Sequence, residues 1–347
     1  MNERKTTNIL LLIIVIPLIF YLLKTLSFIF IPLIAAMFIS LLFLPLMRWL
    51  KRRGVPKILS ILIVILIIAA FGKLSGELIK LSSREILATN DVFFEKAKFK
   101  LSELVLTLEE FFGVEFLHEE DMLGSLIQRD TVIKNFAPTL GLISQTVTKV
   151  LTTLFFVILL LAGSVDMQKL LSSTILKQHY SSVKTFMKIE KDLVTFIKVK
   201  FFVSFLTGVG ISIACWGFGI SFPIFWGLFA FAINFLQMVG SIVTVVLLAI
   251  FAFVEKDSAS LILLFTLTTT GVQVLFGGIL EPIFMGRSFS INIVTILIML
   301  MLWGYVWGIP GLVMSIPITV FLKILAEQFA GTKIIAELLA GDNTRHP

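Results

Sequence analysis

The sequence predicts an all-α polytopic membrane protein with about eight transmembrane helices, interrupted or re-entrant hairpins, and a helical extramembrane insert. Three observations lead to this prediction. The 347-residue chain is 58% hydrophobic and 15% charged, whereas a soluble domain is typically about 45–50% apolar and about 25% charged. Its mean hydropathy is +1.03. Its apolar residues fall into long runs, separated by basic loops and one polar insert.

The first apolar run, Ile9–Leu46, is too long for one helix. Lys24 lies near its middle and suggests a turn, so we expect two spans at about 9–23 and 28–46. Apolar sequence continues past the first span without a small-residue cleavage site, which favours an uncleaved anchor over a signal peptide.

A basic turn, a third span and the polar insert come next. Gly54 and Pro56 end the second helix, and the third span is expected at about 58–72. The insert, residues 73–149, holds nine basic and twelve acidic side chains, and its apolar residues between Phe99 and Phe112 recur at helical spacing. That spacing predicts an amphipathic helix. The basic residues of the turn are Arg48, Lys51, Arg52, Arg53 and Lys57.

The positive-inside rule predicts the orientation. After a fourth span at about 150–163, the loop 164–200 carries seven basic and three acidic side chains. This loop, the basic turn and the N-terminus all fall on one side if the spans alternate, and we expect that side to be the cytoplasm. The insert then faces outside. An even number of crossings, eight or ten, leaves both termini in the cytoplasm.

The C-terminal spans are interrupted. One runs over about 201–220, the apolar run 222–254 breaks at 234–241, and a last apolar block covers 290–327. Paired helices broken by Gly and Pro are the best sequence indication of a transport site, because unwound backbone can then face a cavity. We expect hinge or backbone-lining roles for Pro223, Gly240, Pro282, Gly286, Gly304, Gly308, Pro310, Gly311 and Pro317. For the three glycines Gly304, Gly308 and Gly311, close helix packing is the favoured role.

Glu281 and Arg287 lie between two runs that are each apolar enough to cross a bilayer. A charge at the bilayer centre costs roughly 2.5–3.5 kcal/mol on insertion scales, so such groups are functional candidates. The two could pair as a gate, or Glu281 could carry a coupling proton. The alternative is an interfacial ion pair that only sets topology, which contributes about 0–1 kcal/mol.

Three amides are also candidates. Asn234 and Gln237 lie about one helical turn apart and could line a polar cavity, or they could only hydrogen-bond neighbouring helices. Gln273, in the following span, joins the substrate-pathway candidates.

The sequence divides into five parts. They are N-terminal transmembrane helices (1–72), the extracytoplasmic insert (73–149), a span with a basic loop (150–200), a transport core (201–330) and a cytoplasmic tail (331–347).

The chain resembles the autoinducer-2 exporter family over nearly its whole length. The shared pattern comprises Pro32–Ala35, Leu44–Leu50, Arg53–Pro56, Gly217–Pro223, Asn234–Gly240, Gln273, Glu281-Pro282, Met285–Ser288, Gly304, Gly308, Gly311 and Pro317. The resemblance implies a polytopic exporter or permease of the bacterial cell membrane that forms a homo-oligomer in the lipid bilayer. Relatives are linked to export of the quorum signal autoinducer-2, to sodium/proton antiport and to sporulation. The chain departs from the pattern at Gln237, Ser241 and Asn292-Ile293, so substrate preference does not carry over.

Several functions are disfavoured. There is no phosphate-binding loop and no HExxH motif, and the single Cys215 and three scattered histidines do not suggest a metal site. We therefore expect no enzyme, no cofactor and no nucleic-acid partner. The favoured hypothesis is a secondary transporter that exports a small polar solute or a cation in exchange for protons. The alternative is a structural or sporulation-type membrane protein whose insert is a docking surface.

Overall fold

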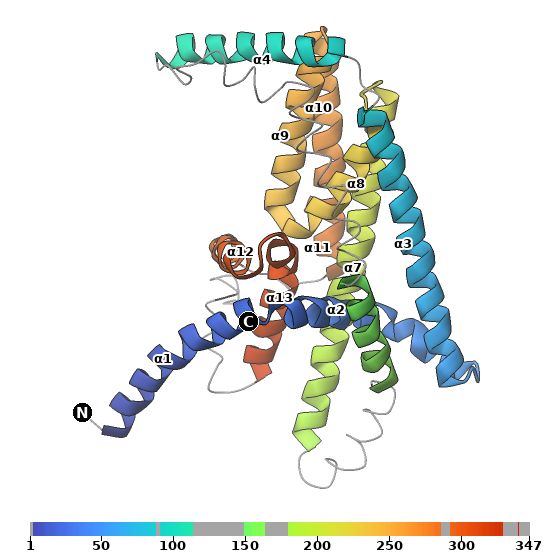
Figure 1. Cartoon of the computed structure of the whole chain (residues 1–347), viewed down its shortest axis with the longest axis vertical. Coiled ribbons are helices and arrows are strands. Elements are labelled where there is room, and N and C mark those ends of the chain that lie inside the picture. The colour runs from blue at the N-terminus through green and yellow to red at the C-terminus, as the bar shows by residue number, and fades with distance from the viewer. Residues whose placement is uncertain are drawn as a thin grey trace. The chain divides into compact units, whose positions relative to one another are not determined.

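The computed structural model describes residues 3–87, 91–113, 149–163, 180–285, 292–328 and 339. All regular elements in these ranges are helices (Figure 1), which confirms the all-α membrane prediction. Five helices are long and apolar enough to cross a membrane, and shorter apolar helices accompany them. The chain divides into two compact units. One holds residues 1–67, 148–200 and 285–347, and the other holds 68–147 and 201–284.

The first two predicted spans are α1 (Glu3–Thr25) and α2 (Ser27–Arg52), with the turn at Leu26. Lys24 therefore marks the boundary between two helices, as expected. Its Nζ lies 4.0 Å from the ring centre of Tyr305, and the carbonyl oxygen of Leu23 accepts a hydrogen bond from Trp307. The end of α1 is thus held by α12 (Ile293–Trp307), within the first unit.

The helix of the third span continues past residue 72, where we expected the span to end, because α3 runs from Lys57 to Leu87. One predicted loop is wrong. The basic segment 164–200 is not all loop, because α7 begins at Tyr180 and continues to Gly217. Its side chains Leu193, Phe196 and Lys200 are buried. They recur at helical spacing, so one face packs while Lys191 and Lys198 remain at the surface.

A helical hairpin of α12 (Ile293–Trp307) and α13 (Ile309–Gln328) forms the C-terminal part of the first unit. The chain reverses at Gly308, which has a φ of +64°, a conformation that costs glycine little. Only this break occurs in the described part of the block. Gly304 lies within α12 and Pro317 within an uninterrupted α13, so the breaks expected there are wrong.

A second hairpin, in the other unit, joins α8 (Pro223–Ile233) to α9 (Gln237–Glu255) through a 3-10 turn at Asn234–Leu236. The predicted break at 234–241 is therefore confirmed. Pro223 is at the first position of α8, where the missing proline N–H costs no helical hydrogen bond.

The two hairpins share one packing device, a glycine on the second helix beside a carbonyl of the first. A Cβ on Gly240 would lie 2.0 Å from the oxygen of Ile233, and one on Gly311 would lie 1.9 Å from that of Trp303. Any larger side chain would push the two helices apart. The expectation that Gly311 allows close packing is consistent with this geometry, and the same role extends to Gly240.

One long helix follows α9 and extends from Ala259 to Met285. The segments α10 (Ala259–Gln273), a π-helical stretch (Val274–Leu280) and α11 (Glu281–Met285) follow one another without a loop. Pro282 was expected in a broken part of the chain as a hinge or backbone-lining residue, but both Glu281 and Pro282 are helical. Pro282 cannot donate to the carbonyl four residues earlier, and the N–H of Glu281 bonds to Phe276, five residues back. The wider turns fit the proline into the helix.

The predicted amphipathic helix is present as α4 (Asp91–Phe112). In Figure 1 it lies across the end of α9 and α10, and two of its lysines hold that end. Lys96 donates to the Glu255 carbonyl at 3.2 Å, and Lys100 donates to the Phe253 and Lys256 carbonyls at 3.0 and 2.6 Å. These carbonyls are at the C-terminus of α9, where helix geometry leaves acceptors free and favours cations.

The rest of the insert and several other predicted features lie outside the described residues. They are residues 114–148, the loop 164–179, Gly286, Arg287 and nearly all of the tail 331–347.

Candidate functional site

A pocket of about 590 Å³ lies between α9 and the α10–α11 helix in the second unit. Four of the predicted site residues line it: Asn234, Gln273, Glu281 and Pro282. They are separated by up to about fifty positions in sequence, and the α8–α9 hairpin and the long helix bring them together. The other lining residues are Ser241, Ile242, Val245, Val246, Thr270, Val274, Gly277 and Gly278.

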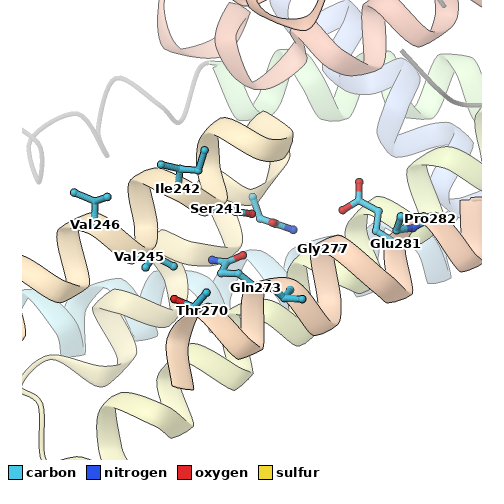
Figure 2. Close-up of a pocket in the computed structure, with 12 residues that line it drawn as sticks. Ser241, Ile242, Val245, Val246, Thr270, Gln273, Gly277, Glu281 and Pro282 are labelled. Carbon is cyan, nitrogen blue, oxygen red and sulfur yellow. The ribbon is translucent and has the colours of Figure 1, made fainter. Parts of the chain in front are cut away.

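The polar side chains come from facing helices. Figure 2 shows Ser241 on one side of the space, with Gln273 and Glu281 reaching into it from the other. Ile242, Val245 and Val246 form an apolar wall on α9. The pocket therefore combines a small polar set with a hydrocarbon surface, as sites for small molecules usually do.

Gln273 is the most informative member. Its side chain is 5% exposed, and neither its amide nitrogen nor its amide oxygen has a hydrogen-bond partner in the described structure. Leaving a buried polar group without a partner costs about 1–3 kcal/mol. The missing bonds make Gln273 a candidate contact for a ligand or water in the pocket.

Asn234 has a structural contact and a pocket position at once. It is 2% exposed, and its Nδ2 donates to Ser204 Oγ of α7 at 3.0 Å. The interhelical hydrogen bond that we considered as an alternative to a site role is thus present. It occupies one amide hydrogen, so the contact and the pocket role are compatible.

Glu281 is buried, with 4% of its surface exposed. It has an interaction within the structure, and it lies where the π-helical stretch returns to α-helix. Such π-helical turns occur often at functional sites. Gly277 and Gly278 lie on this stretch and leave space in front of α9. A Cβ on Gly277 would be 3.7 Å from Ser241 Oγ.

The remaining predicted residues whose side chains the structure describes do not line this pocket. Gln237 begins α9, next to the lining residues, but its side chain is outside the described set. Pro223 lies at the opposite end of α8, and Gly240 closes the hairpin. The group Gly304, Gly308, Pro310, Gly311 and Pro317 belongs to the other unit.

Sequence reasoning missed Ser204, Ser241, Thr270 and the glycine pair. The pair Gly277 and Gly278 had a usable signal, because two adjacent glycines lie in an apolar span and Pro282 follows four residues after the second of them. The hydroxyl residues had none, since Ser and Thr occur throughout the apolar spans.

Comparison with known proteins bears on what this membrane chain does. The sequence profile described as AI-2E family transporter matches residues 9–331. The chain belongs to the AI-2E transporter family. This family membership, together with the apolar helices, makes it a multi-pass bacterial membrane protein with a role in membrane transport.

Individual relatives agree with the assignment to the AI-2E family. The AI-2 transport protein TqsA of Escherichia coli is 25% identical over 323 residues, which are 91% of this chain and 90% of TqsA. A Bacillus subtilis protein provisionally named transport protein YrrI is 27% identical over 318 residues, 87% of this chain and 86% of its own length. A Borreliella burgdorferi protein, also provisionally named a transport protein, is 33% identical over 147 residues, but the match spans only 42% of this chain and 41% of that protein.

Proposed function

We propose that this AI-2E family member is a secondary transporter that exports a small polar solute or a cation from the cytoplasm in exchange for protons. The solute would bind in the pocket between α9 and α10. The observation that carries the proposal is the unpartnered, buried amide of Gln273 in a pocket that also contains Asn234 and Glu281. An autoinducer-2-like signal is one candidate solute, since TqsA is named as an AI-2 transport protein.

Glu281 is the proposed coupling group. A carboxylate can take up and release a proton, and in a membrane such groups mark proton and ion pathways. Its position beside Pro282 and the π-helical stretch supports this role, because the backbone there is not held by a regular hydrogen-bond ladder. Arg287, Gln237 and the glycine-closed hairpins remain proposed gate and hinge elements.

Export from the cytoplasm requires that the protein lie in the bacterial inner membrane in one defined orientation. We propose that both termini and the basic turn at 48–57 face the cytoplasm, as the charge distribution predicts. We also propose that the protein works as a homo-oligomer.

The test is flux in proteoliposomes loaded with a panel of solutes, under imposed sodium and proton gradients. Glu281→Gln should abolish gradient-driven flux while the protein inserts at normal levels. Glu77→Gln is the matched control, because it makes the same change at an exposed position on α3. Unchanged flux in Glu281→Gln would remove this residue from the mechanism. Absence of flux for every solute would favour the structural alternative.

A further inference from the structure

A second cavity lies between α3, α7 and α8, within the second unit and apart from the pocket between α9 and α10. We call it the α3 groove. Residues within 71–78 of α3, 205–212 of α7 and 224–231 of α8 line it, and all but Ser75 and Ser212 are apolar or glycine. Its volume of about 220 Å³ is below the usual range of about 300–1,000 Å³ for pockets that enclose small molecules. The groove therefore suits a narrow apolar chain better than a compact solute.

Two glycines give the groove its depth. A Cβ on Gly208 would lie 2.7 Å from the carbonyl oxygen of Gly227, and a Cβ on Gly227 would lie 2.8 Å from that of Gly208. The backbones of α7 and α8 thus touch where both glycines line the groove, and neither residue has a side chain to fill the space in front. Side chains of α3 form the opposite wall.

Aromatic rings close one end of the groove. Phe201 of α7 lies 5.9 Å from Phe71 of α3 and 5.7 Å from Phe231 of α8, measured between ring centres. Phe71 is the first lining residue of α3, and Phe231 is the last of α8. Farther along α3, Ile86 packs on the core cluster that contains Ile211 of α7, so α3 runs in the same direction as α7. The other end of the groove therefore lies toward the turn between α7 and α8.

The mouth of the groove is continuous with the surface that the bilayer covers. Leu74, Phe205 and Val209 line the groove and are 58%, 48% and 40% exposed in the chain. They belong to α3 and α7, which are both long and apolar enough to cross the membrane. Apolar side chains exposed on such helices face hydrocarbon chains, so lipid has direct access to the groove.

Polar contacts mark the membrane boundary at the end near the α7–α8 turn. There the Glu255 carboxylate accepts hydrogen bonds from the backbone N–H and the hydroxyl of Ser221 at 2.9 and 2.7 Å. Helix α7 ends at Gly217, and Ser212 lies five residues earlier, about 7.5 Å along the helix. The polar layer on each side of a bilayer's hydrocarbon core is about 5–8 Å thick. Ser212 therefore lies near the depth of the lipid ester groups.

The side chain of Ser212 is suited to bind such a group. On the same helices, Thr207 donates to the Val203 carbonyl at 2.9 Å and Ser83 donates to the Ile79 carbonyl at 2.7 Å, each within its own helix. The Ser212 hydroxyl makes no hydrogen bond to the described part of the chain. An ester carbonyl accepts hydrogen bonds and cannot donate them, so it complements this hydroxyl.

We propose that the α3 groove binds one acyl chain of a membrane glycerophospholipid and that an ester carbonyl of this lipid accepts a hydrogen bond from Ser212. The chain packs against Gly208 and Gly227, and its end reaches the rings at Phe71. The lipid enters from the leaflet on the side of the α7–α8 turn. This site is separate from the solute pocket and does not depend on the proposed transport.

The test is native mass spectrometry of the full chain, released from detergent after titration with one lipid. The two probes are palmitoyl-oleoyl phosphatidylglycerol and the dialkyl ether lipid with the same headgroup and chain lengths, which lacks both ester carbonyls. One ester lipid per chain should bind about tenfold more tightly than any further lipid, because a fitted groove adds packing contacts that an open helix face lacks. The ether lipid should bind there about fivefold more weakly, since a single hydrogen bond in a membrane contributes little. Stepwise binding without a distinct first lipid, or equal binding of both probes, would overturn the inference.

Serine variants test which end of the groove holds the ester group. In Ser212→Ala the two probes should bind equally, while Ser75→Ala should leave the preference for the ester lipid unchanged. Ser75 is the matched control, because it lines the same groove and its hydroxyl also makes no hydrogen bond within the described ranges, but it lies one turn from Phe71 at the closed end. Loss of the preference in Ser75→Ala, or its survival in Ser212→Ala, would refute the assigned orientation.

A bulky side chain in the groove tests the location of the lipid. Val209→Trp should weaken binding of the first lipid about tenfold, because the larger ring occupies the space of the chain. Ile213→Trp is the matched control, since Ile213 is 61% exposed one turn later on α7 and does not line the groove. Equal effects of the two variants would contradict a lipid site here. A changed subunit number in Val209→Trp with unchanged lipid binding would assign the groove to a contact between copies of the chain, which would also overturn the inference.

Discussion

Lys100 of α4 and Asp257, which follows α9, form an ion pair with 2.7 Å between Nζ and a carboxylate oxygen. Lys96, one turn earlier, reaches the other oxygen of the same carboxylate at 3.1 Å. Both lysines also donate hydrogen bonds to backbone carbonyls of α9 and of Lys256, which follows it. Together these contacts hold α4 at the C-terminal end of α9. Since α9 has 19 residues and rises about 1.5 Å per residue, its opposite end lies about 28 Å away, and that end lines the pocket. The first helix of the insert is therefore part of the unit that carries the candidate site.

Removing both lysines should release α4. In Lys96→Ala/Lys100→Ala, hydrogen exchange of the backbone amides of α4 and of residues 253–258 should accelerate by about tenfold, because the carbonyls and Asp257 lose their partners. Lys98→Ala is the control, since Lys98 is exposed and lies between the two on the same helix. Equal exchange in the double variant and the control would show that the lysine contacts do not hold the helix.

The same contact should depend on pH. The neighbouring ammonium groups of Lys100 and Lys96 lower the pKa of Asp257 below its ordinary value. When α4 detaches, the pKa of Asp257 returns to about 4, so the detached state binds protons more readily. The contribution of Asp257 is therefore complete above that ordinary value and is lost as pH falls through the lowered one.

Hydrogen exchange of α4, measured from pH 7 down to the acid range and corrected for the intrinsic rate, should show this loss only below about pH 4. In Asp257→Asn the acid-dependent loss should disappear. Loss of protection between pH 5 and 7 would point to a different titrating group.

The two hairpin glycines should be intolerant of side chains. Gly240→Ala or Gly311→Ala puts a methyl group about 2 Å from a carbonyl oxygen of the facing segment, and such overpacking typically costs about 1–3 kcal/mol or more. Thermal unfolding in detergent should occur at a clearly lower temperature. Gly72→Ala is the control, because nothing lies within 4 Å of its added Cβ on α3. There the change should be neutral or stabilising, since alanine favours helix by about 1 kcal/mol.

Local patterns predicted the helices of this chain better than their ends. Apolar runs and Lys24 located α1 and α2, and the Asn234–Gly240 pattern located the turn between α8 and α9. Pro317 and Glu281-Pro282 were misread as breaks because proline disrupts an isolated helix. In the structure both prolines are inside helices, where wider turns or packing against neighbouring helices compensate.

The candidate site shows the same division. Charge and amide groups in apolar spans identified Asn234, Gln273 and Glu281 without structural information, because such groups are costly there. Their convergence in one pocket, and the contribution of Ser204 to Asn234, depend on which helices pack together. That information is not local to any segment, so the sequence alone could not supply it.

Membrane orientation provides an independent prediction, because it follows from the charge of the loops and not from the pocket. In a Cys215→Ser background, which removes the only native thiol, single cysteines replace exposed lysines in the basic turn (Lys51→Cys) and in α4 (Lys98→Cys). A membrane-impermeant maleimide added to intact spheroplasts should label position 98 and not position 51, and both should react after the membrane is opened. The physical reason is that short basic loops are retained in the cytoplasm. Labelling of position 51 in intact cells would reverse the orientation, and with it the direction of export that we assign to the transporter.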